Sequence, residues 1–158
     1  MAKSLILCID DEVNILKSIK RLFIDEEYEI MTTTKGEEGL ELLKKRKVDV
    51  LITDQQMPGI KGLEIIKQAK KISPQTVRIM ITGYSDIDVT ISAINEGEIH
   101  RYIAKPWDND QFKQIVKSVL VKNAADKNGR YNALTVYRLA VRSAALSSAI
   151  SRLSRCSL

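Results

Sequence analysis

Short runs with the composition of β-strands alternate with helix-length segments along the first 122 residues. The strand-like runs are residues 5–9, 28–33, 48–53, 77–81 and 99–104. Apolar residues recur every three or four positions in the segments between and after them, near residues 13–23, 34–46, 63–72, 86–95 and 108–122. This alternation predicts an α/β fold with a doubly wound, five-stranded parallel sheet and helices on both faces.

Local signals refine several of these elements. The run 48–53 is apolar on both faces apart from Asp49, as expected for a central parallel strand. A capping-box pattern at residues 34–37 predicts the start of a helix, and Gly97 suits the C-terminal stop of the helix near 86–95. Either Asp108 or Asp110 can cap the last helix, which we expect to run to about Lys122.

Polar side chains follow four of the five predicted strands. Asp10 and Asp11 come after the first strand, Asp54 after the third, Thr82 after the fourth and Lys105 after the fifth. In a doubly wound sheet the carboxyl ends of the strands share one edge, where ligands bind. Clustered carboxylates repel one another unless a cation is present, and Mg²⁺ favours oxygen ligands. The sequence therefore predicts a magnesium site at which Asp54 attacks a phosphoryl group held by lysine and threonine.

The motifs at these strand ends resemble those of one family. They are Ile9-Asp10-Asp11-Glu12, Asp54-Gln55-Gln56-Met57-Pro58-Gly59, Ile81-Thr82-Gly83 and Tyr102-Ile103-Ala104-Lys105-Pro106. On these motifs, residues 3–122 resemble the receiver domain of two-component response regulators. The resemblance implies a flavodoxin-like fold with strand order 2-1-3-4-5 and a cis Lys105–Pro106 bond.

The resemblance also assigns roles to the residues of the site. It implies that Asp54 is the phosphoacceptor. It further implies that Asp11, Asp54 and the backbone carbonyl of Gln56 ligate Mg²⁺ directly, with Asp10 acting through water. The phosphoryl group would be held by Thr82 and Lys105, and Tyr102 would be the aromatic switch that turns inward when Thr82 moves.

A receiver of this kind acts as a signalling switch, not as a turnover enzyme. We expect a sensor histidine kinase as the phosphoryl donor, and a change in the face built from the fourth helix, fifth strand and fifth helix. That face would control a partner, an output module or homodimerisation. Residues 94–108 are similar to a receiver subgroup that precedes cyclic-dinucleotide phosphodiesterase or transcription-activating modules, but the output stays open.

An enzymatic alternative is an aspartate-nucleophile, Mg²⁺-dependent phosphatase of the haloacid dehalogenase kind. That family also uses aspartate, Mg²⁺, threonine and lysine. Its nucleophile, however, lies in an Asp-x-Asp pattern after the first strand, whereas Asp10 and Asp11 are adjacent and Asp54 follows the third strand. The spacing favours the receiver.

Residues 123–158 differ in composition from the rest of the chain. They carry the whole net charge of +5, because the acidic and basic residues of 1–122 balance. Residues 123–130 suggest a linker and residues 133–155 a helix rich in Ala, Ser, Leu and Arg. This basic tail is either a nucleic-acid-binding or self-associating segment, or a disordered or truncated remnant or foreign sequence. Any contact with nucleic acid is expected only through this tail.

The remaining composition points to a cytoplasmic protein. No apolar stretch approaches the ~20 residues of a membrane helix, and the N-terminus lacks the pattern of a signal peptide. The two cysteines, Cys8 and Cys156, do not form a disulfide framework and are expected to be a buried core residue and a tail thiol.

Overall fold

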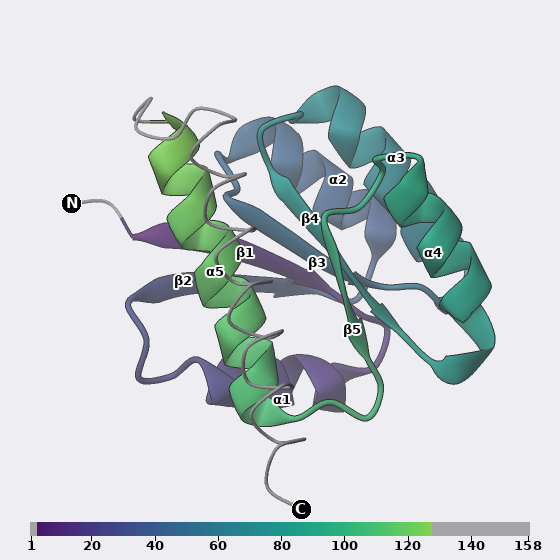
Figure 1. Cartoon of the computed structure of the whole chain (residues 1–158), viewed down its shortest axis with the longest axis horizontal. Coiled ribbons are helices and arrows are strands. Elements are labelled where there is room, and N and C mark those ends of the chain that lie inside the picture. The colour runs from purple at the N-terminus through teal and green to yellow at the C-terminus, as the bar shows by residue number, and fades with distance from the viewer. Residues whose placement is uncertain (1–2, 128–158) are drawn as a thin grey trace, which may run out of the picture. The chain divides into compact units, whose positions relative to one another are not determined.

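A five-stranded parallel sheet forms the centre of the computed structural model, which describes residues 3–127 (Figure 1). The strand order is β2-β1-β3-β4-β5. The strands are β1 Ser4–Ile9, β2 Tyr28–Thr33, β3 Val50–Asp54, β4 Val77–Thr82 and β5 Arg101–Ala104. The helices are α1 Val13–Leu22, α2 Gly36–Lys45, α3 Gly62–Ile72, α4 Ile87–Asn95 and α5 Asn109–Lys127, with a 3₁₀ turn η1 at Tyr84–Asp86. The predicted fold class and strand order are confirmed.

Alternating side chains of the strands build a separate core on each face of the sheet. In β1, Ile6 and Cys8 join the core under α1 and α5, whereas Leu5 and Leu7 join the core under α2 and α3. A smaller cluster on the α3 side includes Met80 and connects α3 to α4. Every position of β3 is buried, because helices cover both of its faces. Asp54 is thus fixed at the end of a fully buried strand.

Several predicted boundaries were wrong; β5, for example, begins at Arg101 and not at residue 99. β3 begins at Val50, two residues later than expected, because the Asp49 carboxylate accepts a hydrogen bond from the Leu5 N–H at 2.9 Å in place of a backbone carbonyl. Helix α5 continues to Lys127, so a linker beginning at residue 123 is wrong for 123–127. Alanines at 124 and 125 favour that extension. The rest of the predicted tail, residues 128–158, lies outside the described residues.

The helix-end signals had mixed outcomes. Helix α2 begins at Gly36 without a side-chain cap, so the predicted capping box at 34–37 was wrong. Thr33, the last residue of β2, instead donates its hydroxyl to the Glu38 carboxylate at 2.6 Å. At α5, Asp108 is the cap, since its carboxylate accepts the Gln111 N–H at 2.8 Å. Gly97 ends α4 with a φ of 72°, as glycine readily does.

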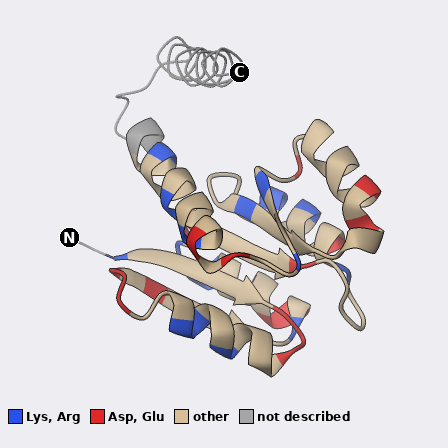
Figure 2. Cartoon of the chain, turned by 60° about the horizontal axis from the view of Figure 1, so that its bottom comes forward, with Lys and Arg blue, Asp and Glu red and all other residues tan. Residues whose placement is uncertain are grey.

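Basic and acidic residues are interspersed over the helices of the described part of the chain (Figure 2). This mixture agrees with the balanced charges of residues 1–122. The net charge of +5, which lies in residues 123–158, is therefore no evidence that the sheet and its helices bind nucleic acid. None of the helices within residues 3–127 is both long and apolar enough to cross a membrane.

The close approach of Gly62 to the chain after Asp54 predicts a stability effect. A Cβ at Gly62 would lie 2.8 Å from the Cα of Gln55 and would also collide with the Asp54 carbonyl. We expect Gly62→Ala to lower the free energy of unfolding in urea by about 1–3 kcal/mol. Gly83→Ala is the matched control, because no atom lies within 4 Å of its Cβ and its φ is −82°. Equal losses in both variants would contradict this account.

Candidate functional site

The strand ends bring the predicted polar residues to one edge of the sheet. Asp10 directly follows β1, Asp54 ends β3, Thr82 ends β4 and Lys105 directly follows β5. The Lys105 ammonium lies 3.0 Å from Asp54 Oδ1 and 3.8 Å from Asp10 Oδ2. A backbone hydrogen bond of 2.8 Å from the Lys105 N–H to the Thr82 carbonyl keeps the ends of β4 and β5 together. The parallel topology thus creates the cluster from residues far apart in sequence.

Three carboxylates at this edge are arranged for a cation. Asp10, Asp11 and Asp54 each offer an oxygen, and these oxygens lie within 4.8 Å of one another. Asp10 and Asp54 are buried, whereas Asp11 is exposed. One buried oxygen, Asp10 Oδ2, has no hydrogen-bond partner within residues 3–127. An unsatisfied buried oxygen beside two further carboxylates fits a site for Mg²⁺ and its waters.

The charges at the site perturb one another. Burial, together with the nearby charges of Asp54 and Asp11, raises the pKa of Asp10 to about 6, although the Glu12 N–H and Lys105 oppose this change. Burial alone would lower the pKa of Lys105, but its hydrogen bond to Asp54 and the surrounding carboxylates raise it overall. Asp10 is therefore the acid that gains most from a bound cation, and Lys105 keeps its positive charge.

The loop after β3 is held by its two glutamines. The Gln55 side chain accepts the Leu63 N–H at 2.9 Å, which fixes the loop to the start of α3. The Gln56 amide donates to the Asp86 carboxylate at 2.6 Å, which links the same loop to η1. The role of the Gln56 backbone carbonyl as a metal ligand stays a prediction. No local sequence signal indicated that Asp86 would be the partner of Gln56.

The two predicted switch residues occupy different environments. Thr82 is buried, and its hydroxyl lies 3.2 Å from both the Thr90 hydroxyl and the Gly83 carbonyl. Tyr102 lies within β5, away from the strand end, and is 39% exposed. The aromatic side chain thus lies partly in solvent here, and its inward turn stays a prediction. Thr90 was missed in the sequence because a threonine within a helix carries no signal for contact with a strand end.

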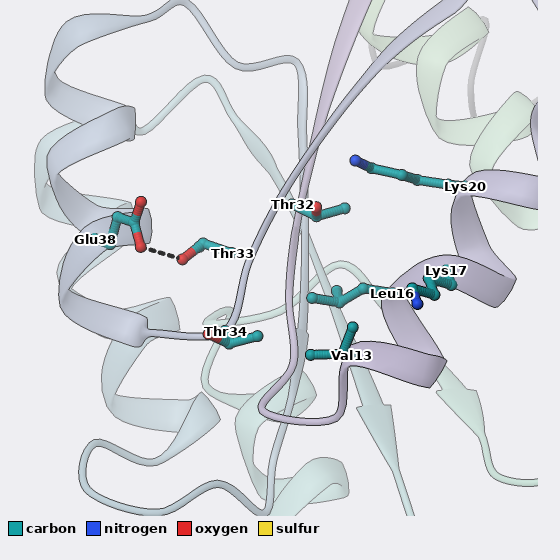
Figure 3. A pocket seen from close by; sticks show the side chains of 8 residues that line it. All are labelled: Val13, Leu16, Lys17, Lys20, Thr32, Thr33, Thr34 and Glu38. Carbon is teal, nitrogen blue, oxygen red and sulfur yellow. Dashed lines mark hydrogen bonds between the residues drawn. The ribbon is translucent and has the colours of Figure 1, made fainter.

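A separate hollow of about 380 Å³ lies between α1 and the end of β2 (Figure 3). The strand-end residues Asp54, Thr82 and Lys105 do not line it. Its lining is Val13, Leu16, Lys17, Lys20, Thr32, Thr33, Thr34 and Glu38. Lys20 partly offsets the effect of burial on the nearby Cys8 thiol, whose pKa burial still raises to about 12. Cys8 is therefore a protonated core residue, as expected, while Cys156 lies outside the described residues.

Comparison with known proteins identifies the family. A sequence model of the response regulator receiver domain matches residues 6–117. The chain belongs to this family. The phosphatase alternative is thereby set aside, since the receiver domain is a signalling domain of two-component systems.

Individual relatives agree with this assignment. The receiver domain is 36% identical over 115 residues to the hydrogenase transcriptional regulatory protein HoxA of Cupriavidus necator, covering 73% of this chain but 24% of HoxA. It is 29% identical over 120 residues to sporulation initiation phosphotransferase F of Bacillus subtilis, covering 76% of this chain and 96% of that protein. The chain thus spans about a quarter of the first relative and nearly all of the second.

A solved receiver structure has the same fold. The response regulator receiver domain protein of Clostridium thermocellum superposes with a TM-score of 0.72 and 33% identity, covering 77% of this chain and 97% of that one. The relatives therefore include both isolated receivers and receivers within longer regulators.

The raised pKa of Asp10 predicts a pH-dependent gain in stability for Asp10→Asn. In the folded chain the carboxyl titrates near 6, above its ordinary value of 3.8, so burying its charge destabilises the fold as the pH rises through this window. With EDTA present, we expect Asp10→Asn to raise the free energy of unfolding by about 1–2 kcal/mol at pH 7.5. The gain should vanish below pH 3.8, where the carboxyl is protonated in both states.

Urea denaturation at several pH values measures this effect. The exposed Asp25→Asn is the matched control and should show no such gain. A gain for Asp10→Asn that is independent of pH would show that the carboxylate charge is not its cause.

Proposed function

We propose that this receiver domain is a phosphorylation-activated switch in which Asp54 accepts a phosphoryl group from a sensor histidine kinase. The observation that supports this function is the geometry of the sheet edge. Three carboxylates offer oxygens within 4.8 Å of one another, and Lys105 lies 3.0 Å from the phosphoacceptor. This arrangement provides a nucleophile, a cation site and a fixed positive charge together.

The transfer is a displacement at phosphorus. The Asp54 carboxylate forms the new P–O bond, while the P–N bond to the kinase histidine breaks and its electron pair returns to the imidazole. Lys105 orients the nucleophile by holding Asp54 Oδ1 and then binds a phosphoryl oxygen. Asp11, Asp54 and the Gln56 carbonyl would hold Mg²⁺ directly, with Asp10 acting through water, and the bound ion would supply positive charge for the phosphoryl oxygens.

Phosphorylation changes the charge balance beside Thr82. By analogy with other phosphorylated side chains, the new group carries about −1.5 to −2 charge and offers strong hydrogen-bond acceptors. Thr82 moves to donate its hydroxyl to this group, and Tyr102 turns into the space that is vacated. The effect is a shift between two populations of the face formed by α4, β5 and α5.

Exposed apolar side chains on that face suggest a protein partner. Ile91 on α4 is 48% exposed, and Tyr102 on β5 is 39% exposed. Such groups gain from burial against a second copy of the chain or an output module. The name of HoxA suggests transcriptional control as one output. The basic tail stays the only proposed contact with nucleic acid, and a cytoplasmic location stays a prediction.

Labelling with a small phosphoryl donor tests the proposed phosphoacceptor. Incubation with acetyl phosphate and Mg²⁺ should add one phosphoryl group to the intact chain, detected by mass spectrometry under conditions that preserve acyl phosphates. Asp54→Asn should remove the adduct, and EDTA should suppress it. Asp25→Asn, at an exposed acid on the turn after α1, is the matched control and should label normally. An unlabelled wild type, or equal labelling of Asp54→Asn, would refute the proposal.

Light scattering after size exclusion tests the proposed homodimer. With Mg²⁺ and beryllofluoride, a phosphoryl mimic, the wild type should shift from monomer towards dimer. Ile91→Ser should weaken the dimer by about tenfold or more, as for an apolar residue central to an interface. Ile24→Ser changes a 75% exposed isoleucine after α1 and should have no effect. If wild type remains monomeric with the mimic bound, the homodimer is wrong and the face must serve another partner.

A further inference from the structure

A buried threonine on α4 contacts the proposed switch residue. Thr90 lies in the first half of α4, and its side chain, like that of Thr82, is fully enclosed. The two hydroxyl oxygens are 3.2 Å apart. The Thr90 hydroxyl also lies 2.9 Å from the Asp86 carbonyl and 3.7 Å from Met80 Sδ. The Thr82 hydroxyl is therefore not free to move in this structure, because the Thr90 hydroxyl donates a hydrogen bond to it.

The two threonine hydroxyls have different roles in this contact. The Thr90 hydroxyl is the donor and the Thr82 oxygen is the acceptor at 3.2 Å, and the Asp86 carbonyl at 2.9 Å is a second acceptor for the same Thr90 proton. The Thr82 hydroxyl donates its own proton to the carbonyl of the adjacent Gly83, also at 3.2 Å. The Thr82 proton is thus bound to an acceptor other than the oxygens of Asp54.

The position of Thr90 is itself fixed by the loop that follows the phosphoacceptor. Asp86 accepts the Thr90 proton through its carbonyl, and its carboxylate accepts the Gln56 amide at 2.6 Å. The Lys61 ammonium, just before α3, donates to the Gln56 side-chain oxygen at 3.3 Å. A continuous series of hydrogen bonds thus runs from the β3–α3 loop through η1 to the two threonines.

We propose that Thr90 is a positioning residue that holds the Thr82 hydroxyl in its resting orientation and so opposes phosphoryl binding at Asp54. The proposal rests on the proposed function, because it requires Thr82 to move towards the phosphoryl group. When Thr82 leaves, Thr90 keeps its bond to Asp86, so no buried donor is left unsatisfied. The cost of activation is then the single bond between the two hydroxyls.

Removal of the Thr90 hydroxyl should make phosphoryl binding tighter. Thr90→Val keeps the branched shape and deletes the hydroxyl that donates to the Thr82 oxygen. Full-length variants would be titrated with beryllofluoride in excess Mg²⁺, with binding followed through the fluorescence of Trp107, the only tryptophan. We expect Thr90→Val to bind beryllofluoride about two- to tenfold more tightly, the range that corresponds to one net neutral hydrogen bond. Thr90→Ser, which restores the hydroxyl, should return the affinity to that of wild type.

A matched variant separates this effect from a general loss of stability. Thr76 is as deeply buried as Thr90, and its hydroxyl donates to the Val48 carbonyl at 2.8 Å near the opposite edge of the sheet. Thr76→Val should lower the free energy of unfolding but leave the beryllofluoride affinity unchanged. If Thr76→Val tightens binding as much as Thr90→Val, a general loosening of the fold is responsible and the proposal is overturned.

A double-mutant cycle tests whether Thr90 acts through Thr82. In a Thr82→Val background no hydroxyl remains to be held, so adding Thr90→Val should not change the affinity further. A persistent gain in that background would overturn the proposal. An unchanged beryllofluoride affinity of Thr90→Val alone would also overturn the proposal. In that case, normal beryllofluoride binding and Asp54 labelling in the wild type would leave the proposed function intact.

If the wild type neither binds beryllofluoride nor is labelled by acetyl phosphate, the proposed function and this inference are both refuted.

Discussion

The repulsion among three carboxylates at one edge of the sheet is the constraint on which the site depends. Asp10 and Asp54 are buried there, and Lys105 is the cation that faces both of them. Burial, together with the charges of Asp54 and Asp11 that one lysine does not balance, raises the pKa of Asp10 to about 6. The remaining negative charge favours a divalent cation, so the same repulsion that destabilises the folded chain would be relieved by a bound Mg²⁺.

The sheet holds this unfavourable cluster in place because its strands are covered on both faces. β3 is buried along its whole length, and its parallel neighbours β1 and β4 end at the same edge. The carboxylates therefore cannot separate without disturbing both hydrophobic cores. Burial of apolar side chains in the two cores therefore offsets the destabilisation caused by the carboxylates at the sheet edge. Such compensation is common where a protein positions charged groups for chemistry.

Polar contacts between the loops connect this edge to α4. Gln56 bonds to Asp86, Asp86 bonds to Thr90, and Thr90 contacts Thr82. A phosphoryl group on Asp54 would compete for the last member of this series, and α4 would respond at its first turns. This connection offers a physical route from the charge at the site to the apolar surface of α4, where a partner would bind.

The sequence by itself determined the order of the elements and the chemistry at the strand ends. Apolar runs are local features, and each of Asp10, Asp54, Thr82 and Lys105 stands next to such a run, so parallel topology alone brings them together. The tertiary structure decided which side chains pair between loops. The bonds from Gln56 to Asp86 and from Thr90 to Thr82 join positions 30 and 8 residues apart, and no periodicity or motif encodes such contacts. The local capping signal at residues 34–37 was also insufficient, since α2 has no side-chain cap and Thr33 bonds to Glu38. Hydrogen-bond partners depend on the packed positions of neighbouring elements.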